Sequence, residues 1–217
     1  MGDAANLFAA FTYVVPGMPM IYTGQPSGNH HRLAFFEKDL IDRVENAPQH
    51  NMYKQLNALR ADNFALWSNE IGAPMAGKAV SVKEVNDPTF SEDILGKGMA
   101  IRPTDGKVFA PCDGEVDLIF ETGHAVSMMT SFGAELLLHI GLDTVNLKGK
   151  HFTIHANIGD QVKKGDLLLE FDLAAVVADG YDPITPMIIC NHHDFGTMEL
   201  KIGNTVVPGD TVMAVAK

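Results

Sequence analysis

The chain has 217 residues, of which 46% are hydrophobic and 20% charged, a composition typical of a soluble globular protein with room for one sizeable core or for a domain with an appendage. Its formal net charge of −11 argues against nucleic acid and anionic membranes as partners, because both would repel it. No run of about 18 apolar residues predicts a transmembrane helix, and the start has no basic n-region of a signal peptide.

The first part of the chain has mainly helical patterns. Residues 4–15 are apolar and rich in alanine, and Pro16 and Gly17 follow as a helix end. PMIYTG at 19–24 predicts a short buried strand, and QPSGNHHR at 25–32 predicts a loop. Residues 52–61 carry apolar side chains at helical spacing, which predicts a second helix.

Beyond residue 72 the pattern changes to short strands separated by Gly, Pro and Asp. Alternating segments such as KVFAPCDGEVDLIF at 107–120 favour an all-β sandwich or barrel. One unit occurs twice, as IGDQVKKGDLLLEF at 158–171 and IGNTVVPGDTVMAV at 202–215. We expect each copy to be a β-hairpin whose glycines take backbone positions that would strain another residue.

Most of the nine histidines and both cysteines have ordinary interpretations. Cys112 and Cys190 lack metal-binding spacing and are expected to be free, buried thiols in a reducing cytoplasm. Solvated loops are expected for the pairs His30–His31 and His192–His193, and no partner motif accompanies His50, His151 or His155.

Two histidines differ because each lies at the end of an apolar segment. GHAVSMMT places His124 at the start of one segment, ELLLHIG places His139 at the end of another, and the short turn SFGAE joins them. An antiparallel hairpin would bring both imidazoles to its open end. Two adjacent core histidines are hard to justify by packing alone.

Paired imidazoles support two kinds of chemistry. One ring, with its tautomer fixed by a hydrogen bond, can act as a nucleophile, while the second ring and the hydroxyl of Thr122 donate to phosphoryl oxygens. Alternatively, the pair can bind zinc, for which a third ligand would have to come from a partner.

At these residues the sequence resembles the glucose-type enzyme IIA domain of the bacterial phosphoenolpyruvate-dependent sugar phosphotransferase system. ELLLHIGLDTV is similar to its phosphohistidine signature, and further matching segments run in order over most of 72–217, including FETGHAV, GDQVKKGDLLLEFDL and GYDPITPMIICN. The resemblance implies an all-β barrel-sandwich hybrid (a duplicated hybrid motif) with a mainly α-helical N-terminal appendage. It also implies a cytoplasmic phosphocarrier, a phosphotransferase component.

The resemblance also implies a role for individual residues. His139 would accept a phosphoryl group from the histidine-containing phosphocarrier protein and pass it to a cysteine of a IIB domain. His124 and Thr122 match the second active-site histidine and its threonine, Gly141 the residue whose carbonyl orients the acceptor ring, and Asp143 a nearby aspartate.

Four apolar positions of the family surround the site and contact partners; they match Phe90, Ile94, Phe120 and Val145. Gly123 departs from relatives that carry lysine there. Since family members use this face for zinc or regulatory targets, a metal shared by His124 and His139 is possible chemistry.

Residues 1–68 resemble the C-terminal end of an α-amylase-type catalytic barrel, through MGDAANLFAAFTYVVPGMPMIYTGQ, RLAFFEKDLID and MYKQLNALRADNFALWS. The catalytic carboxylates of that family lie upstream of the matching segment, and Pro26 and Arg43 depart from its pattern. We therefore expect 1–68 to be a truncated, non-catalytic segment and 69–217 to be the functional domain.

The leading hypothesis is thus a phosphocarrier that serves sugar uptake. A regulatory binding module, whose phosphorylation state controls docking on the apolar rim, is the alternative. A glycoside hydrolase is a weaker third, because its carboxylates are missing.

Overall fold

The computed structural model describes residues 3–15, 19–21, 25–29, 41, 44, 47–63, 66 and 68–216. The chain forms two compact units, Met1–Ser68 and Asn69–Lys217. Within the described residues no helix is long and apolar enough to cross a bilayer. His30, His31 and Arg43 lie outside the described ranges.

The first unit contains a pair of α-helices, α1 (Asp3–Val14) and α2 (Pro48–Asp62), and the short 3-10 helix η1 (Gln25–Ser27). Both predicted helices are confirmed, and α2 begins four residues earlier than predicted, with Pro48 in its first turn. Tyr13 joins the pair: its hydroxyl donates to Asn57 Oδ1 at 2.8 Å, and its ring lies 6.3 Å from that of Tyr53.

The predicted strand at 19–24 is wrong in its described part. Residues 19–21 have no strand structure, and Met20 and Ile21 are 80% and 41% exposed. The remainder of that segment lies outside the described residues. The described part of 1–68 contains helices and no β-strand.

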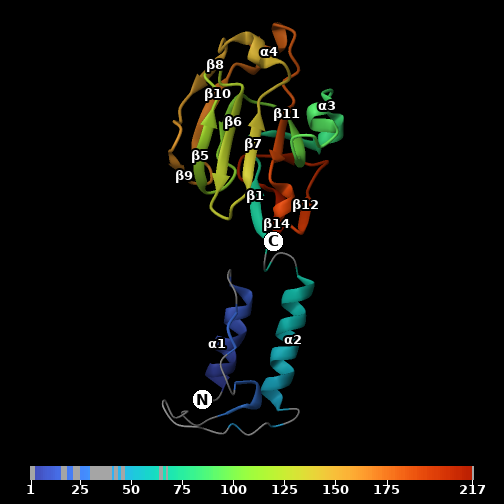
Figure 1. The fold of residues 1–217 in the computed structure, drawn as a ribbon, viewed down its shortest axis with the longest axis vertical. Coiled ribbons are helices and arrows are strands. Elements are labelled where there is room, and N and C mark those ends of the chain that lie inside the picture. The colour runs from blue at the N-terminus through green and yellow to red at the C-terminus, as the bar shows by residue number, and fades with distance from the viewer. Residues whose placement is uncertain are drawn as a thin grey trace. The chain divides into compact units, whose positions relative to one another are not determined.

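The second unit is built from strands in three antiparallel sheets (Figure 1). Its strands are β1 (Asn69–Gly72), β2 (Gly77–Ser81), β3 (Lys97–Pro103), β4 (Lys107–Phe109), β5 (Gly114–Ile119), β6 (Ala125–Thr130), β7 (Glu135–His139), β8 (Phe152–Ile154), β9 (Gln161–Val162), β10 (Leu167–Phe171), β11 (Thr185–Ile189), β12 (Thr197–Leu200), β13 (Thr205–Val206) and β14 (Thr211–Ala216). Short helices connect them: η3 (Val82–Glu84), α3 (Pro88–Ser91), η4 (Thr144–Leu147), α4 (Leu173–Ala178) and η5 (His192–Asp194).

Each of the three sheets combines strands from distant parts of the sequence. The largest sheet has the order β13-β2-β3-β11-β7-β6-β5-β9, and the two smaller sheets have the orders β1-β14-β12 and β4-β10-β8. None of the sheets closes into a barrel. The expected all-β architecture with a helical N-terminal segment is confirmed.

The core lies between the sheets, and a smaller apolar cluster covers the other face of the large sheet. Leu136 and Leu138 of β7 are fully buried in the main core, as the alternation of a strand requires. Leu137 points to the opposite face, where its pairing partner Ile188 packs with Val80 and Phe90. One face of strand β7 is therefore fully buried in the main core, whereas Leu137 on the other face is only half-buried beside the smaller cluster.

The repeated unit is not the hairpin that we predicted. In each copy the two strands enter different sheets: β9 joins the large sheet and β10 a small one, and likewise β13 joins the large sheet and β14 a small one. The tight turn between them is therefore a corner at which the chain passes from one sheet to another.

The two corners have matching hydrogen bonds. Gly165 N–H and Asp166 carbonyl pair with Ala110, and Gly209 N–H and Asp210 carbonyl pair with Ala73 in the same way. Both glycines have positive φ, +96° and +92°, so the glycine part of the prediction is confirmed. The aspartates also match, because Asp166 Oδ2 accepts from Lys163 N–H at 2.7 Å and Asp210 Oδ2 from Val207 N–H at 2.9 Å.

Equivalent corners should contribute equally to stability. We expect Asp166→Ala and Asp210→Ala each to lower the free energy of unfolding by about 1 kcal/mol, because each removes one hydrogen bond to a backbone N–H. The double variant should lose about 2 kcal/mol, because the two aspartates accept from different backbone N–H groups and share no hydrogen-bond partner. Urea denaturation measures this, with Asp117→Ala, an exposed change on β5, as the control. A large loss at one corner and none at the other would show that the corners are not equivalent.

Candidate functional site

The antiparallel pair β6–β7 brings His124 and His139 together. Ala125 pairs with His139, Met128 with Leu136 and Met129 with Glu135, so the hairpin forms around the turn that the sequence predicts. The Ile140 N–H donates to the His124 carbonyl at 2.7 Å and extends the pairing past the strand ends. The two ring centroids lie 5.2 Å apart at an interplanar angle of 77°.

This contact depends on a departure from strand geometry at His124. Residues directly opposite each other in an antiparallel pair share a face, so Ala125, and not His124, shares the face of His139. His124 lies in a bend before β6, directly after Gly123, whose φ of +68° is in the left-handed region. Because it precedes the strand, its ring is free of the alternation and can meet the His139 ring.

The His139 ring is held by a hydrogen bond between its Nδ1 and the Gly141 carbonyl, at 2.8 Å. A carbonyl oxygen can only accept, so Nδ1 carries the proton and Nε2 keeps its lone pair. Gly141 has φ +72°, and a Cβ there would lie 2.7 Å from Thr144 Cγ2 and 3.0 Å from the Asp182 carbonyl. Only glycine fits this position without displacing the carbonyl.

The His124 ring has a different partner. Thr122 Oγ1 lies 2.5 Å from its Nδ1. When the hydroxyl donates to Nδ1, the proton of the ring is on Nε2, which then can donate to a bound oxygen. The two rings thus pair a lone-pair nitrogen on His139 with a donor nitrogen on His124.

Apolar rings pack on both imidazoles. The Phe90 centroid is 5.2 Å from that of His139, and the Phe120 centroid is 4.9 Å from that of His124. Burial is the main cause that lowers the pKa of both histidines, and the neighbouring His139 lowers that of His124 further. For His139 the Gly141 hydrogen bond, Asp87 and Asp143 oppose the shift by favouring the charged ring.

Asp87 is a residue that sequence reasoning missed. Its Oδ1 accepts from the Thr89 N–H at 2.8 Å and begins α3, and its charge acts on His139 from the side of Phe90. Asp87 precedes Pro88, a helix-start pattern that was visible in the sequence, but nothing local linked it to a residue 52 positions away. Asp143 is exposed, at φ +57° in the turn before η4.

The predicted apolar rim is exposed at three of its four positions. Ile94, Phe120 and Val145 are 65%, 41% and 45% exposed, and Leu95, which the sequence analysis did not select, is 41% exposed. Phe90 differs: it is 3% exposed and packs in the smaller apolar cluster. In this conformation its visible role is to support the His139 ring, and contact with a partner would need it to become exposed.

The remaining titratable side chains lie elsewhere. His151 and His155 have carboxylate partners that sequence reasoning did not find, Asp179 and Glu170, each at 3.0 Å. Both cysteines are free; burial raises the pKa of Cys112 to about 12, while Cys190 is only partly buried. No group of three or more possible metal ligands occurs among the described residues.

Comparisons with known proteins agree on one family. The family described as phosphoenolpyruvate-dependent sugar phosphotransferase system, EIIA 1, matches residues 69–195. The glucose-specific EIIA component of Halalkalibacterium halodurans is 41% identical over 170 residues, which are 76% of this chain and 98% of that protein. A beta-glucoside-specific EIIBCA component from Dickeya chrysanthemi is 45% identical over 140 residues, 64% of this chain.

The relatives differ in length. The chain spans 22% and 23% of the two beta-glucoside-specific EIIBCA components that it matches, from Dickeya chrysanthemi and Halalkalibacterium halodurans. Among solved structures, glucose permease IIA from Mycoplasma capricolum superposes with a TM-score of 0.64 at 36% identity, over 68% of this chain and 95% of that one.

The pKa directions predict neutral rings at pH 7. Because burial disfavours the imidazolium, both histidines should take up their protons only below the ordinary pKa of 6.5. His139→Gln should raise the pKa of His124, since it removes one cause of the depression. Histidine NMR titration measures both values. A His139 pKa above 6.5, or no change for His124 in the variant, would contradict this electrostatic description.

Gly141→Ala tests how the acceptor ring is held. The new methyl group would meet Thr144 and displace the carbonyl, so we expect loss of the single His139 tautomer and a free-energy cost of about 1–3 kcal/mol. Adding Thr144→Ser removes Cγ2 and keeps the hydroxyl that donates to the Ile140 carbonyl. The double variant should therefore recover part of the single His139 tautomer and part of the lost stability. The ring ¹⁵N shifts report the tautomer; shifts that stay the same in Gly141→Ala would rule out this role.

Proposed function

The chain belongs to the EIIA 1 family of the phosphoenolpyruvate-dependent sugar phosphotransferase system, and on this premise we propose that it is a phosphocarrier whose acceptor is Nε2 of His139. The observation that carries the proposal is the His124–His139 pair, with Nδ1 of His139 bound to the Gly141 carbonyl. It supports a nucleophile with its lone pair directed away from the backbone, beside a second ring that can donate.

The transfer step uses these groups as follows. The Nε2 lone pair of His139 attacks the phosphorus of a phosphohistidine donor, and the donor's P–N bond breaks with its electron pair returning to the donor ring. His139 then carries the phosphoryl group on Nε2 and a proton on Nδ1, and the ring is positive. The Gly141 carbonyl, Asp87 and Asp143 all favour that charge.

His124 has the complementary part. With Thr122 donating to Nδ1, its Nε2–H points a proton at the oxygens of the phosphoryl group, and burial strengthens this hydrogen bond. In the onward step a cysteine thiolate attacks the phosphorus and the P–Nε2 bond of His139 breaks. Charge that develops on the phosphoryl oxygens in this onward step meets the Nε2–H donor of His124.

The partners follow from the family and from the exposed rim. The donor we propose is the histidine-containing phosphocarrier protein, and the acceptor is a cysteine of a sugar-specific IIB domain, in line with relatives named as EIIBCA components. Ile94, Phe120 and Val145 offer apolar area for such partners, close to His124 or on segments adjoining His139. A regulatory module would use the same rim, and no contact in the structure favours it over the relay.

We also propose that the histidine pair binds zinc when a partner protein supplies the remaining ligands. Each ring uses Nδ1 in a hydrogen bond, so the two Nε2 atoms are the ones available as ligands. They provide half of a tetrahedral shell, and the described residues hold no third ligand nearby. Zinc binding by the isolated chain with the same strength as in the presence of a partner, measured by equilibrium dialysis, would contradict this.

The proposed acceptor is tested by phosphorylation with phosphoenolpyruvate, enzyme I and the phosphocarrier protein. We expect an acid-labile, base-stable phosphate that maps to His139 and disappears in His139→Gln. His155→Gln, a change of the same kind at an exposed histidine, is the control and should be labelled normally. Label that persists in His139→Gln would overturn the assignment.

In the same assay His124→Gln separates the two rings. It should still accept phosphate, because Nε2 of His139 is intact. Transfer on to the IIB domain should slow by about 100-fold or more, the effect of losing one donor to developing charge. Unaltered onward transfer would remove His124 from the proposed mechanism.

A further inference from the structure

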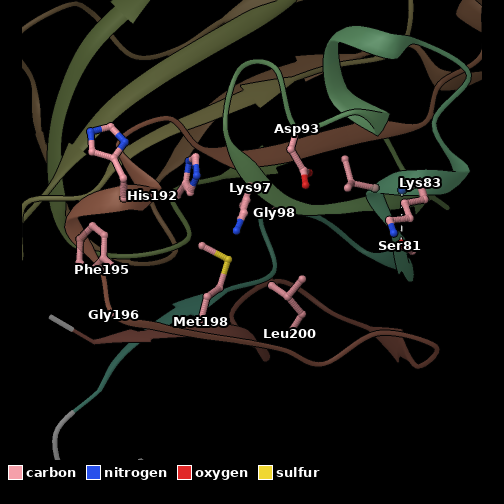
Figure 2. A pocket seen from close by; sticks show the side chains of 12 residues that line it. Ser81, Lys83, Asp93, Lys97, Gly98, His192, Phe195, Gly196, Met198 and Leu200 are labelled. Carbon is pink, nitrogen blue, oxygen red and sulfur yellow. Dashed lines mark hydrogen bonds between the residues drawn. The ribbon is translucent and has the colours of Figure 1, made fainter.

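A cavity lies away from the histidine pair, between β2, β3, η5 and β12 (Figure 2). Its volume is about 560 Å³, within the range of about 300–1,000 Å³ typical of small-molecule sites. It lies by Lys97, at the start of β3, which pairs with the end of β11, whereas His139 is at the far end of the neighbouring strand β7. None of the residues assigned to phosphoryl transfer lines it.

Basic side chains dominate the lining, although the whole chain carries a net charge of −11. Lys83, Lys97, His192 and His193 line the cavity, and Asp93 is the one acidic residue among the described lining residues. Figure 2 shows Lys97 reaching into the middle, with His192 on one side and Lys83 on the other. Neither lysine forms an ion pair within the described residues, so neither charge is neutralised by a neighbour.

The imidazoles add an unusual feature. Nδ1 of His192 is buried and has no hydrogen-bond partner within the described structure. Buried polar atoms are nearly always hydrogen-bonded, so this unpaired nitrogen lowers the stability of the fold unless a ligand bonds it. Since no protein group bonds Nδ1 within the described structure, the ring retains an unused hydrogen-bonding atom at the cavity. His193 lies beside it, with ring centroids 5.6 Å apart.

The opposite side of the cavity is apolar. Met198 and Leu200 of β12 line it together with the buried Phe195. Met198 and Leu200 lie beyond residue 195, the last residue that the family match covers. A cavity with a basic side and an apolar side fits a ligand with an anionic group on a less polar body.

We propose that this cavity binds a small phosphorylated organic molecule, with its phosphoryl group at Lys97 and the His192–His193 pair and its body against Met198 and Leu200. Lysine is a point-charge donor suited to phosphate, and imidazole N–H groups add direction. The negative field of the rest of the chain opposes binding, but at physiological salt it is screened beyond about 8 Å. The local basic side chains therefore determine the sign of the electrostatic potential inside the cavity. This site does not depend on phosphoryl transfer at His139.

Titration with glucose 6-phosphate, followed by the backbone amide signals in NMR spectra, tests the proposal. We expect saturable shifts at Lys97, Gly98 and Gly196, weaker ones with inorganic phosphate, and none with glucose, which lacks the charge. The shifts should weaken as salt is raised. Shifts that appear only at His124 and Gly141, equal binding of glucose, or no saturable shifts with either phosphate probe would overturn it.

Substitutions of single charged residues measure how much each one contributes to binding. Lys97→Gln should weaken binding of glucose 6-phosphate about 5-fold and Lys83→Gln, farther from the phosphoryl group, about 2-fold. Both side chains are exposed, so the fold should persist. Asp93→Asn, which also suits the left-handed φ of +58° at that residue, should tighten binding by removing the repulsion. Lys107→Gln, an equal charge change on β4, is the control; an effect as large as that of Lys97→Gln would show general attraction and no site.

Discussion

The hydrogen bond from the His139 ring to the Gly141 carbonyl sets the chemistry of the site. It fixes which nitrogen carries the proton, which nitrogen can attack, and where positive charge is stabilised after attack. The carbonyl can accept this bond because the chain turns sharply at Gly141, where φ is +72° and neighbouring atoms leave no room for a Cβ. Thr144 packs against that turn and donates to the Ile140 carbonyl, so the acceptor and its support form one local structure.

The surrounding sheet makes this arrangement rigid. Strand β7 is paired on both edges, by β6 and β11, and one of its faces is fully buried in the main core. A nucleophile at its end therefore has little freedom, which is what in-line transfer requires, because such catalysis is mostly positioning. Burial of the two rings also lowers the pKa of both histidines, so burial both restricts the site and keeps its nucleophile neutral.

The two sheet corners connect the large sheet to the two smaller ones. Each copy of the repeated unit passes from the large sheet to a small one, and the turns at Gly165 and Gly209 have the same hydrogen bonds. The three sheets are thereby joined around one core with connections of only a few residues. The basic cavity lies at the opposite strand ends from the histidine pair, so the two sites occupy different ends of the same sheet.

The sequence by itself determined the elements and the chemistry that depend on local pattern. Alternation, turn pairs and the leucine run were sufficient for the β architecture, the β6–β7 hairpin and the two histidines at its open end, because short-range spacing fixes which side chains share a strand end. The helices of the first unit were also predictable. The strand expected at 19–24 was wrong in its described part, since an apolar run alone does not show whether a partner strand is present.

Only the tertiary structure decided the relations between distant segments. The repeated unit is a corner and not a hairpin, because pairing partners such as Ala73 and Ala110 come from elsewhere in the chain. The charge of Asp87 near His139, the burial of Phe90 and the grouping of Lys83, Lys97 and His192 around one cavity likewise arise from contacts across many residues. Local periodicity contains no information about such contacts, because they depend on which sheets the strands join.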